Sequence, residues 1–113
     1  MPQALQPCDE VGISPELKAQ LDSLPEDHKF NRWIKQDMRD ALLYNRRCGE
    51  QIEINKIPKK YRIIYEVNNL FHYGHPEGYR SCYTILHVGN NIFHGWILDL
   101  LSHNEYEDLF GYR

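Results

Sequence analysis

Three segments of strand length in the second half of the chain, separated by two short breaks, constrain the fold more than any other feature. They are rich in aromatic and β-branched residues, which favour strands. They span residues 70–73, 78–85 and 91–100. The breaks at 74–78 and 88–91 hold the glycines, proline and asparagines of tight turns. Because connections this short join antiparallel neighbours, residues 68–112 predict a three-stranded antiparallel meander.

Composition places the chain among single-domain globular proteins. Its 113 residues suit one domain, and its 42% hydrophobic and 26% charged residues are ordinary for a packed core with a solvated surface. No apolar run approaches the roughly 20 residues of a membrane helix, and the N-terminus lacks the pattern of a secretory signal. We therefore expect a cytoplasmic protein with no membrane partner. A formal net charge of −3 does not by itself indicate a nucleic-acid-binding protein.

The spacing of cysteines and histidines gives no sign of a disulfide framework or a metal site. The three cysteines are odd in number and far apart. They are Cys8, Cys48 and Cys82. The histidines of the second half lack the short spacings that place two ligands on one face. We expect no metal and no other cofactor, although His72 and His94 lie on different predicted strands and could approach each other.

The first half of the chain predicts mainly helices. Residues 1–10 carry two prolines and little that could pack, so we expect a flexible N-terminus followed by one domain over 11–113. Residues 10–13 are predicted as a short edge strand. Residues 14–16, Ser-Pro-Glu, then supply a cap, a first-turn proline and an acidic first turn, which predict a helix of about ten residues.

A longer helix is predicted from the Ser-x-x-Glu capping box at residues 23–26 to about Arg47. Its apolar residues recur at intervals of three and four and define one face. They are Phe30, Trp33, Ile34, Met38, Ala41 and Leu42. Gly49 is predicted as the left-handed cap after this helix. The tight junction at residues 23–27 makes the two helices an antiparallel hairpin, whose apolar face we expect to pack on the sheet.

Residues 50–67 are the least regular part of the sequence. Pro58 interrupts alternating isoleucines, residues 56–62 are the most basic stretch, and residues 63–67 are predicted as a strand or an approach to one. Residues 102–105 cap a short C-terminal turn that Gly111 closes. The predicted fold class is therefore α+β, with an N-terminal helical hairpin packed on a three- to four-stranded antiparallel sheet and a short C-terminal helical turn.

Short motifs along most of the chain match a known family in register. Two of them are the helix–turn–helix start at residues 15–26 and the glycine-marked helix exit at 48–52. Residues 69–80 resemble a pair of strands joined by a Gly-Tyr-Arg, and residues 103–112 resemble a terminal His-x-x-Tyr followed by Phe-Gly-Tyr. Over residues 11–113 the chain resembles the RelE/ParE superfamily of bacterial and archaeal toxins, which implies a RelE-like fold.

This resemblance implies the toxin component of a type II toxin–antitoxin system, bound by a cognate antitoxin protein. RNA-cutting members cleave mRNA in the ribosome without a metal or another cofactor, whereas ParE-type relatives act on DNA gyrase. In the RNA-cutting members, basic side chains and a tyrosine orient the RNA 2′-hydroxyl, stabilise the charge on the phosphate and protonate the leaving oxygen. The implied partners are therefore the antitoxin, mRNA and the ribosome.

Carried onto this sequence, the resemblance assigns a catalytic site to Arg80, His103, Tyr106 and His72. Arg80 matches the arginine at the scissile phosphate, and a guanidinium suits bidentate phosphate binding. By strand alternation it shares a face with Cys82. A histidine such as His103 can act as acid or base near neutral pH. An RNA-binding role falls to the basic residues of the preceding segment, Lys59, Lys60 and Arg62.

Two functions stay open, because Phe71 and Tyr73 stand where RNA-cutting members carry two lysines, with His72 between them. The first is a metal-independent mRNA endoribonuclease. The second is a non-catalytic member that acts by binding, either to DNA gyrase or to an antitoxin alone. The nuclease function requires Arg80, His103 and Tyr106 to converge on one concave, net-positive surface.

Overall fold

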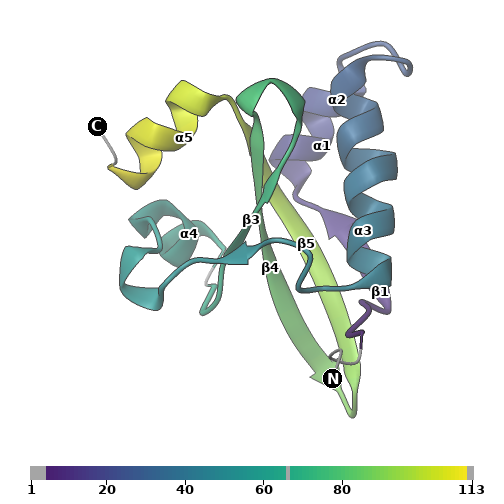
Figure 1. Ribbon diagram of the computed structural model, residues 1–113, viewed down its shortest axis with the longest axis vertical. Helices are drawn as coiled ribbons and strands as arrows, with labels where there is room; N and C mark the ends of the chain where they lie inside the picture. The colour runs from purple at the N-terminus through teal and green to yellow at the C-terminus, as the bar shows by residue number, and fades with distance from the viewer. Residues whose placement is uncertain (1–4, 66, 112–113) are drawn as a thin grey trace.

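The computed structural model describes residues 5–65 and 67–111, and its backbone is a mixed five-stranded sheet with helices on both sides (Figure 1). The strands are β1 (Glu10–Ile13), β2 (Glu50–Gln51), β3 (Phe71–Gly74), β4 (Arg80–Gly89) and β5 (Ile92–Leu101), in the order β1-β5-β4-β3-β2. The helices are α1 (Pro15–Asp22), α2 (Lys29–Arg32), α3 (Arg39–Tyr44), α4 (Lys59–Ile64) and α5 (His103–Phe110). A π-helical segment, Trp33–Met38, joins α2 and α3 into one long helix. The predicted α+β class is confirmed.

The predicted meander is confirmed, but the sheet is not purely antiparallel. Strands β3, β4 and β5 pair antiparallel in sequence order, with Phe71 opposite Tyr83. The predicted strand at residues 10–13 exists, and it pairs with β5 in parallel, with Gly12 opposite Trp96. Parallel neighbours need a long connection, and here it contains helices α1 to α4 and the other three strands. The sequence contained no signal for this pairing between its two ends.

Alternating side chains give the sheet two buried faces. The first face packs under α1 and the long helix and includes Phe71, Tyr83 and Ile97. The second face packs under α4 and α5 and includes Cys82 and Leu98. Residues two apart on a strand share a face, so Arg80 belongs to the second face, as the alternation predicts.

The long helix begins later than the sequence predicts, at Lys29. His28 caps it, because its Nδ1 accepts the N–H of Phe30 at 3.0 Å. Ser23 does not cap it, because the Ser23 hydroxyl donates to the carbonyl of Gln20 at 2.6 Å at the end of α1. The serine of the apparent capping box therefore closes the first helix.

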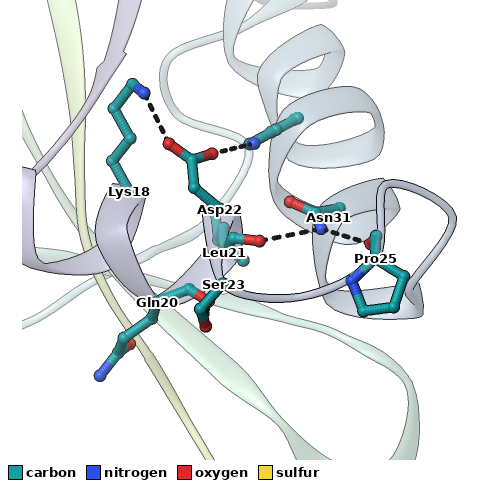
Figure 2. A network of polar contacts seen from close by, with 8 residues as sticks. Lys18, Gln20, Leu21, Asp22, Ser23, Pro25 and Asn31 are labelled. Atoms are coloured by element: carbon teal, nitrogen blue, oxygen red, sulfur yellow. Dashed lines mark hydrogen bonds and ion pairs between the residues drawn. The ribbon is translucent and has the colours of Figure 1, made fainter.

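Side chains join the two helices at this end (Figure 2). Asn31 Nδ2 donates to the carbonyl oxygens of Leu21 and Pro25, at 3.1 and 2.9 Å. Lys35 Nζ lies 2.8 Å from a carboxylate oxygen of Asp22. Because α1 itself packs on β5, these contacts tether the helices without the regular pairing of a helical hairpin.

The long helix also ends earlier than predicted, at Tyr44. Asn45 is extended, with φ −157°, and its Oδ1 accepts the N–H of Arg47 at 3.2 Å. Gly49 is not the left-handed cap that the sequence predicts, because its backbone does not adopt a positive φ.

Gly49 is instead the point where the loop before β2 closely approaches strands β3 and β4. A Cβ at this position would lie 2.4 Å from the carbonyl oxygen of His72 and 2.9 Å from the ring of Tyr83. The Tyr83 hydroxyl accepts the N–H of Gly49 at 2.9 Å and donates to the carbonyl of Arg46 at 2.9 Å. A side chain at position 49 would thus move the loop before β2 away from Tyr83 and break these hydrogen bonds.

The prediction of a strand at residues 63–67 is wrong where the structure describes it. Residues up to Ile64 belong to α4, and Glu66 lies outside the described residues. Pro58 precedes the helix, and Tyr61 anchors it by being fully buried with Ile57 in the core of the second face. One buried aromatic side chain thus decides the conformation of this basic segment.

The predicted C-terminal turn is confirmed as helix α5. Ser102 and Glu105 form a reciprocal capping box, and Gly111 ends the helix with φ 72°. Residues 1–4 of the predicted flexible tail, and residues 112–113, lie outside the described residues. Cys8 is buried and donates its N–H to the carbonyl of Leu42. No helix in the described part of the chain is long and apolar enough to cross a membrane.

Replacing Gly49 by alanine tests the close approach. We expect Gly49→Ala to lower the free energy of unfolding by about 1–3 kcal/mol, the usual cost of forcing atoms into a packed site. Gly74→Ala is the matched control, because a Cβ there meets nothing within 4 Å. Urea unfolding curves of both variants measure the difference. Equal stability of the two variants would contradict the steric role of Gly49.

Candidate functional site

Three of the predicted site residues meet on the second face. The guanidinium carbon of Arg80, at the start of β4, lies 4.7 Å from the centre of the Tyr106 ring. The ring of His72, on β3, stacks on the same tyrosine with 5.5 Å between centroids and 26° between planes. Among the residues that the structure describes, Arg80 has no carboxylate partner. Its positive charge therefore remains open to an anion.

Tyr106 carries the aromatic ring on which Arg80 and His72 pack, and the three residues form the Arg80 cluster. The side chain of Tyr106 is 3% exposed and also stacks on Phe110, with centroids 4.4 Å apart. The capping box of α5 fixes the helix that carries it. A cation over an aromatic face is stabilised by the ring quadrupole, so Tyr106 orients the guanidinium of Arg80. Its burial favours this positioning role over direct proton transfer.

His72 has one ring nitrogen in an ion-pair contact and one without a partner. Its Nε2 lies 3.1 Å from a carboxylate oxygen of Glu50, the residue opposite it on β2. Its Nδ1 is buried and has no hydrogen-bond partner within residues 5–65 and 67–111. A buried polar atom without a partner costs free energy.

His103 lies at the first turn of α5 and is accessible. Its side chain is 55% exposed, and its Nε2 lies 2.6 Å from a carboxylate oxygen of Glu107 one turn along the helix. It borders the turn that leads into Arg80, because a Cβ on Gly78 would lie 3.4 Å from the Cβ of His103. An exposed imidazole held by a carboxylate has the geometry of a general acid or base.

The predicted RNA-binding residues of α4 do not act as one group. Lys60 lies 2.8 Å from a carboxylate oxygen of Asp99, which also accepts the hydroxyl of Tyr61 at 2.8 Å. Arg62 donates to the carbonyl of Ile54, and Lys59 is exposed. Of the three, Lys60 is the one bonded to a residue on the same face as the cluster.

The register across the sheet relates Lys60 to His72. Cys82 lies opposite both His72 and Asp99, so one row crosses the second face from β3 to β5. Neighbouring strands are about 4.8 Å apart, which puts the backbone of Asp99, the partner of Lys60, about 10 Å from the backbone of His72. The charge of Lys60 is therefore near the cluster and is partly offset by its own carboxylate.

Phe71 and Tyr73 point away from the site. They face α1 and the long helix, and the Phe71 ring stacks on Tyr83 with centroids 5.1 Å apart. On β3 it is His72 that shares the face of Arg80. Lysines at positions 71 and 73 would therefore point into the core, so their absence here removes no charge from the cluster.

A second histidine contact, which the sequence did not predict, lies on the first face. His75 Nε2 lies 2.6 Å from the hydroxyl oxygen of Ser81, and its ring is parallel to Trp33 at 5.6 Å. Burial lowers the pKa of His75 to about 4, and Asp37 opposes this weakly. Ser81 is completely buried, so no substrate reaches its hydroxyl. This pair is structural.

The histidines do not form a metal site in the described part of the chain. No group of three histidine, cysteine or acidic residues is suitably placed there. His94 lies opposite Leu86, far along β4 from the row of His72, and its Nε2 is 3.7 Å from a carboxylate oxygen of Glu10. The expectation that His72 and His94 could approach each other is wrong, because β4 separates their rows by four residues.

Comparisons with known proteins add no further constraint on this site. No protein-family model, no curated protein and no solved structure matches the chain. The geometry offers an arginine on an aromatic ring that also stacks on His72, with His103 near the turn that precedes the arginine. Such a group can bind a phosphate and exchange protons with the atoms around it.

The pH dependence of stability tests the burial of His75. Well above pH 6.5, the ordinary pKa of histidine, its imidazole is neutral in both the folded and the unfolded chain. Between pH 6.5 and about 4 the unfolded chain takes up a proton that the folded protein excludes, so we expect stability to fall by up to about 3 kcal/mol and then level off.

The contribution of His75 is isolated by comparing how steeply the free energy of unfolding depends on pH in the wild type and in variants. Urea unfolding between pH 7.5 and 4 should give a flatter dependence for His75→Gln than for the wild type. His87→Gln, at an exposed histidine, should keep the wild-type slope. An unchanged slope in His75→Gln would mean that other groups carry the acid sensitivity.

Proposed function

We propose that this chain is a RelE-like toxin, an endoribonuclease that cleaves mRNA without a metal ion. The observation that carries the proposal is the guanidinium of Arg80, which stacks on Tyr106 beside His72 and has no carboxylate partner in the described residues. An arginine held in this way fits two oxygens of a phosphate.

The proposed reaction is an in-line attack within the RNA. The 2′-oxygen forms a bond to the phosphorus, the bond from phosphorus to the 5′-oxygen breaks, and a 2′,3′-cyclic phosphate and a free 5′-hydroxyl result. Arg80 stabilises the charge that develops on the phosphate oxygens. The imidazoles of His103 and His72 remove the proton from the 2′-hydroxyl and return one to the leaving oxygen.

Charge favours a reaction that depends on the ribosome. Carboxylates offset three of the basic groups around the cluster, through the pairs His72–Glu50, Lys60–Asp99 and His103–Glu107. Neutralisation of backbone charge dominates affinity for nucleic acids, so this surface binds free RNA weakly. The ribosome would supply the positioning, and a cognate antitoxin would hold the toxin inactive.

The second candidate function is a non-catalytic member of the same fold, directed at DNA gyrase or at an antitoxin alone. The burial of Tyr106 favours it, because a tyrosine that is 3% exposed is poorly placed to transfer a proton to RNA. The two candidates differ in whether Arg80 contributes to a chemical step.

Induced expression in a bacterial host separates the two functions. For the wild type we expect growth arrest together with new transcript 5′ ends, and for Arg80→Ala about 10²–10³-fold slower cleavage, the usual cost of removing one electrostatic contact to a transition state. Growth curves and mapping of transcript 5′ ends are read from the same cultures.

The matched control is Arg39→Ala, an exposed arginine of the long helix that is 54% exposed and pairs with Asp40. It should arrest growth as the wild type does. Arrest with intact transcripts, abolished or not by Arg80→Ala, would favour the binding function. Soluble expression without arrest would contradict the nuclease and the gyrase-directed function, and would favour a member that binds an antitoxin alone.

A further inference from the structure

Strand β4 runs well past β3, so its far half has a strand on one side only. β3 pairs with β4 up to Tyr83, whereas β5 follows β4 along its whole length. The hairpin of β4 and β5 therefore projects beyond the rest of the sheet (Figure 1). Residues 85–88 of β4 form the free edge of this hairpin.

Hydrogen bonds on both sides fix the direction of the backbone groups at the free edge. Asn69 Oδ1 accepts the N–H of Ile85, and Asn69 Nδ2 donates to the carbonyl oxygen of Ile85, both at 2.9 Å. The backbone N–H and C=O of Ile85 therefore point away from β5. Opposite His87, both backbone groups of Phe93 bond to Asp9 instead of to β4. The alternation of an antiparallel pair then directs the N–H and C=O of His87 outward.

The side chain of Asn69 occupies the place of a partner strand at Ile85. It satisfies both backbone groups of that residue, as an opposite strand residue would. At His87 no hydrogen bond to its backbone is made from this side within residues 5–65 and 67–111. An unpaired edge of this kind is a template for another extended chain.

The two sides of the free edge differ in chemistry. On the first face, a hollow of about 440 Å³ is lined by Arg46, Arg47 and Phe93 among others, and no carboxylate lines it. On the second face, Leu86 and Val88 are 40% and 52% exposed. One side is therefore basic and the other apolar.

The two arginines are held toward the hollow without acidic partners. Arg46 stacks on Phe93 at 3.7 Å, and Arg47 Nε donates to the amide oxygen of Gln6 at 2.8 Å. Neither forms an ion pair in the part of the chain that the structure describes. The nearby Asp9 accepts the N–H of Phe93. Their charge is complementary to an acidic ligand.

We propose that the free edge binds an extended acidic segment of a partner protein as an additional strand. Main-chain hydrogen bonds to His87 would supply the affinity, and displacement of the Asn69 amide would add those of Ile85. Because successive side chains of a strand point to opposite faces, the segment alternates acidic residues, which face Arg46 and Arg47, with β-branched residues that cover the apolar side.

Other occupants fit the same surface less well. A second copy of this chain, paired edge to edge, would bring two sets of arginines together without a counter-charge. A single-stranded nucleic acid offers phosphates to the arginines but no ladder of N–H and C=O groups to the backbone of β4. The proposal uses no residue of the Arg80 cluster, so its outcome and that of the nuclease proposal are independent.

Binding of a designed peptide tests the proposal. The probe is a fluorescein-labelled hexapeptide of alternating valine and glutamate, titrated with the full chain and followed by fluorescence anisotropy at low salt. We expect a dissociation constant in the range of roughly 1–100 µM, weakened about tenfold or more when glutamine replaces glutamate or in the Arg47→Gln variant. N-methylation of alternate peptide amides should abolish binding, since it removes donors along one edge.

Matched measurements guard against unfolding and against the other occupants. Arg39→Gln, on the long helix, should bind the peptide within twofold of the wild type, and unfolding midpoints check that each variant folds. Amide exchange at His87 should slow on peptide binding. The proposal would be overturned if the glutamine peptide bound with equal affinity, or if the amides protected on binding lay in β1 or β2 instead. It would also be overturned by a dimer that competes with the peptide, or by an oligouridylate that binds more tightly than the peptide.

Discussion

The hydroxyl group of Tyr83, in the middle strand of the sheet, is the contact on which both layers depend. It donates to the carbonyl of Arg46 and accepts the N–H of Gly49. Burial raises the pKa of Tyr83 well above its usual range, so the group remains a donor. Through these two bonds the exit of the long helix is attached to the sheet, and the absence of a side chain at Gly49 allows the approach.

This attachment on the first face also determines the second. Once Gly49 is fixed, the next residue enters β2 and pairs with β3, which places Glu50 opposite His72. His72 in turn stacks on Tyr106, and Tyr106 carries the guanidinium of Arg80. A tyrosine in the core and an arginine at the surface are thus connected by a series of direct contacts through the sheet.

The sequence predicted the elements whose cause is local. The meander follows from its turn residues, and helix α5 follows from Ser102, Glu105 and Gly111. Prediction from the sequence failed where contacts outside the segment determine its structure. Strand β1 pairs in parallel with β5, and Ser23 ends the first helix although its sequence pattern resembles the start of the next. Helix α4 forms because one aromatic residue is buried beneath it, which composition alone does not reveal.

The candidate site was predictable in the same uneven way. Strand alternation correctly put Arg80 on the face of Cys82, and the resemblance brought His72 and Tyr106 to it. The carboxylates of Glu50 and Asp99 were not predicted beside His72 and Lys60, because these pairs join residues that are distant in the sequence. The same alternation shows that Phe71 and Tyr73 belong to the core.

Pairing between the two ends of the chain affects how this protein is made. β1 lies beside β5, and the Ser14 hydroxyl donates to the carbonyl of Leu98 at 2.7 Å, 84 positions later in the sequence. A ribosome therefore exposes the first strand and its following helix long before their partner is synthesised. During translation these early segments stay without their core, and the sheet closes only after the last strand has left the exit tunnel.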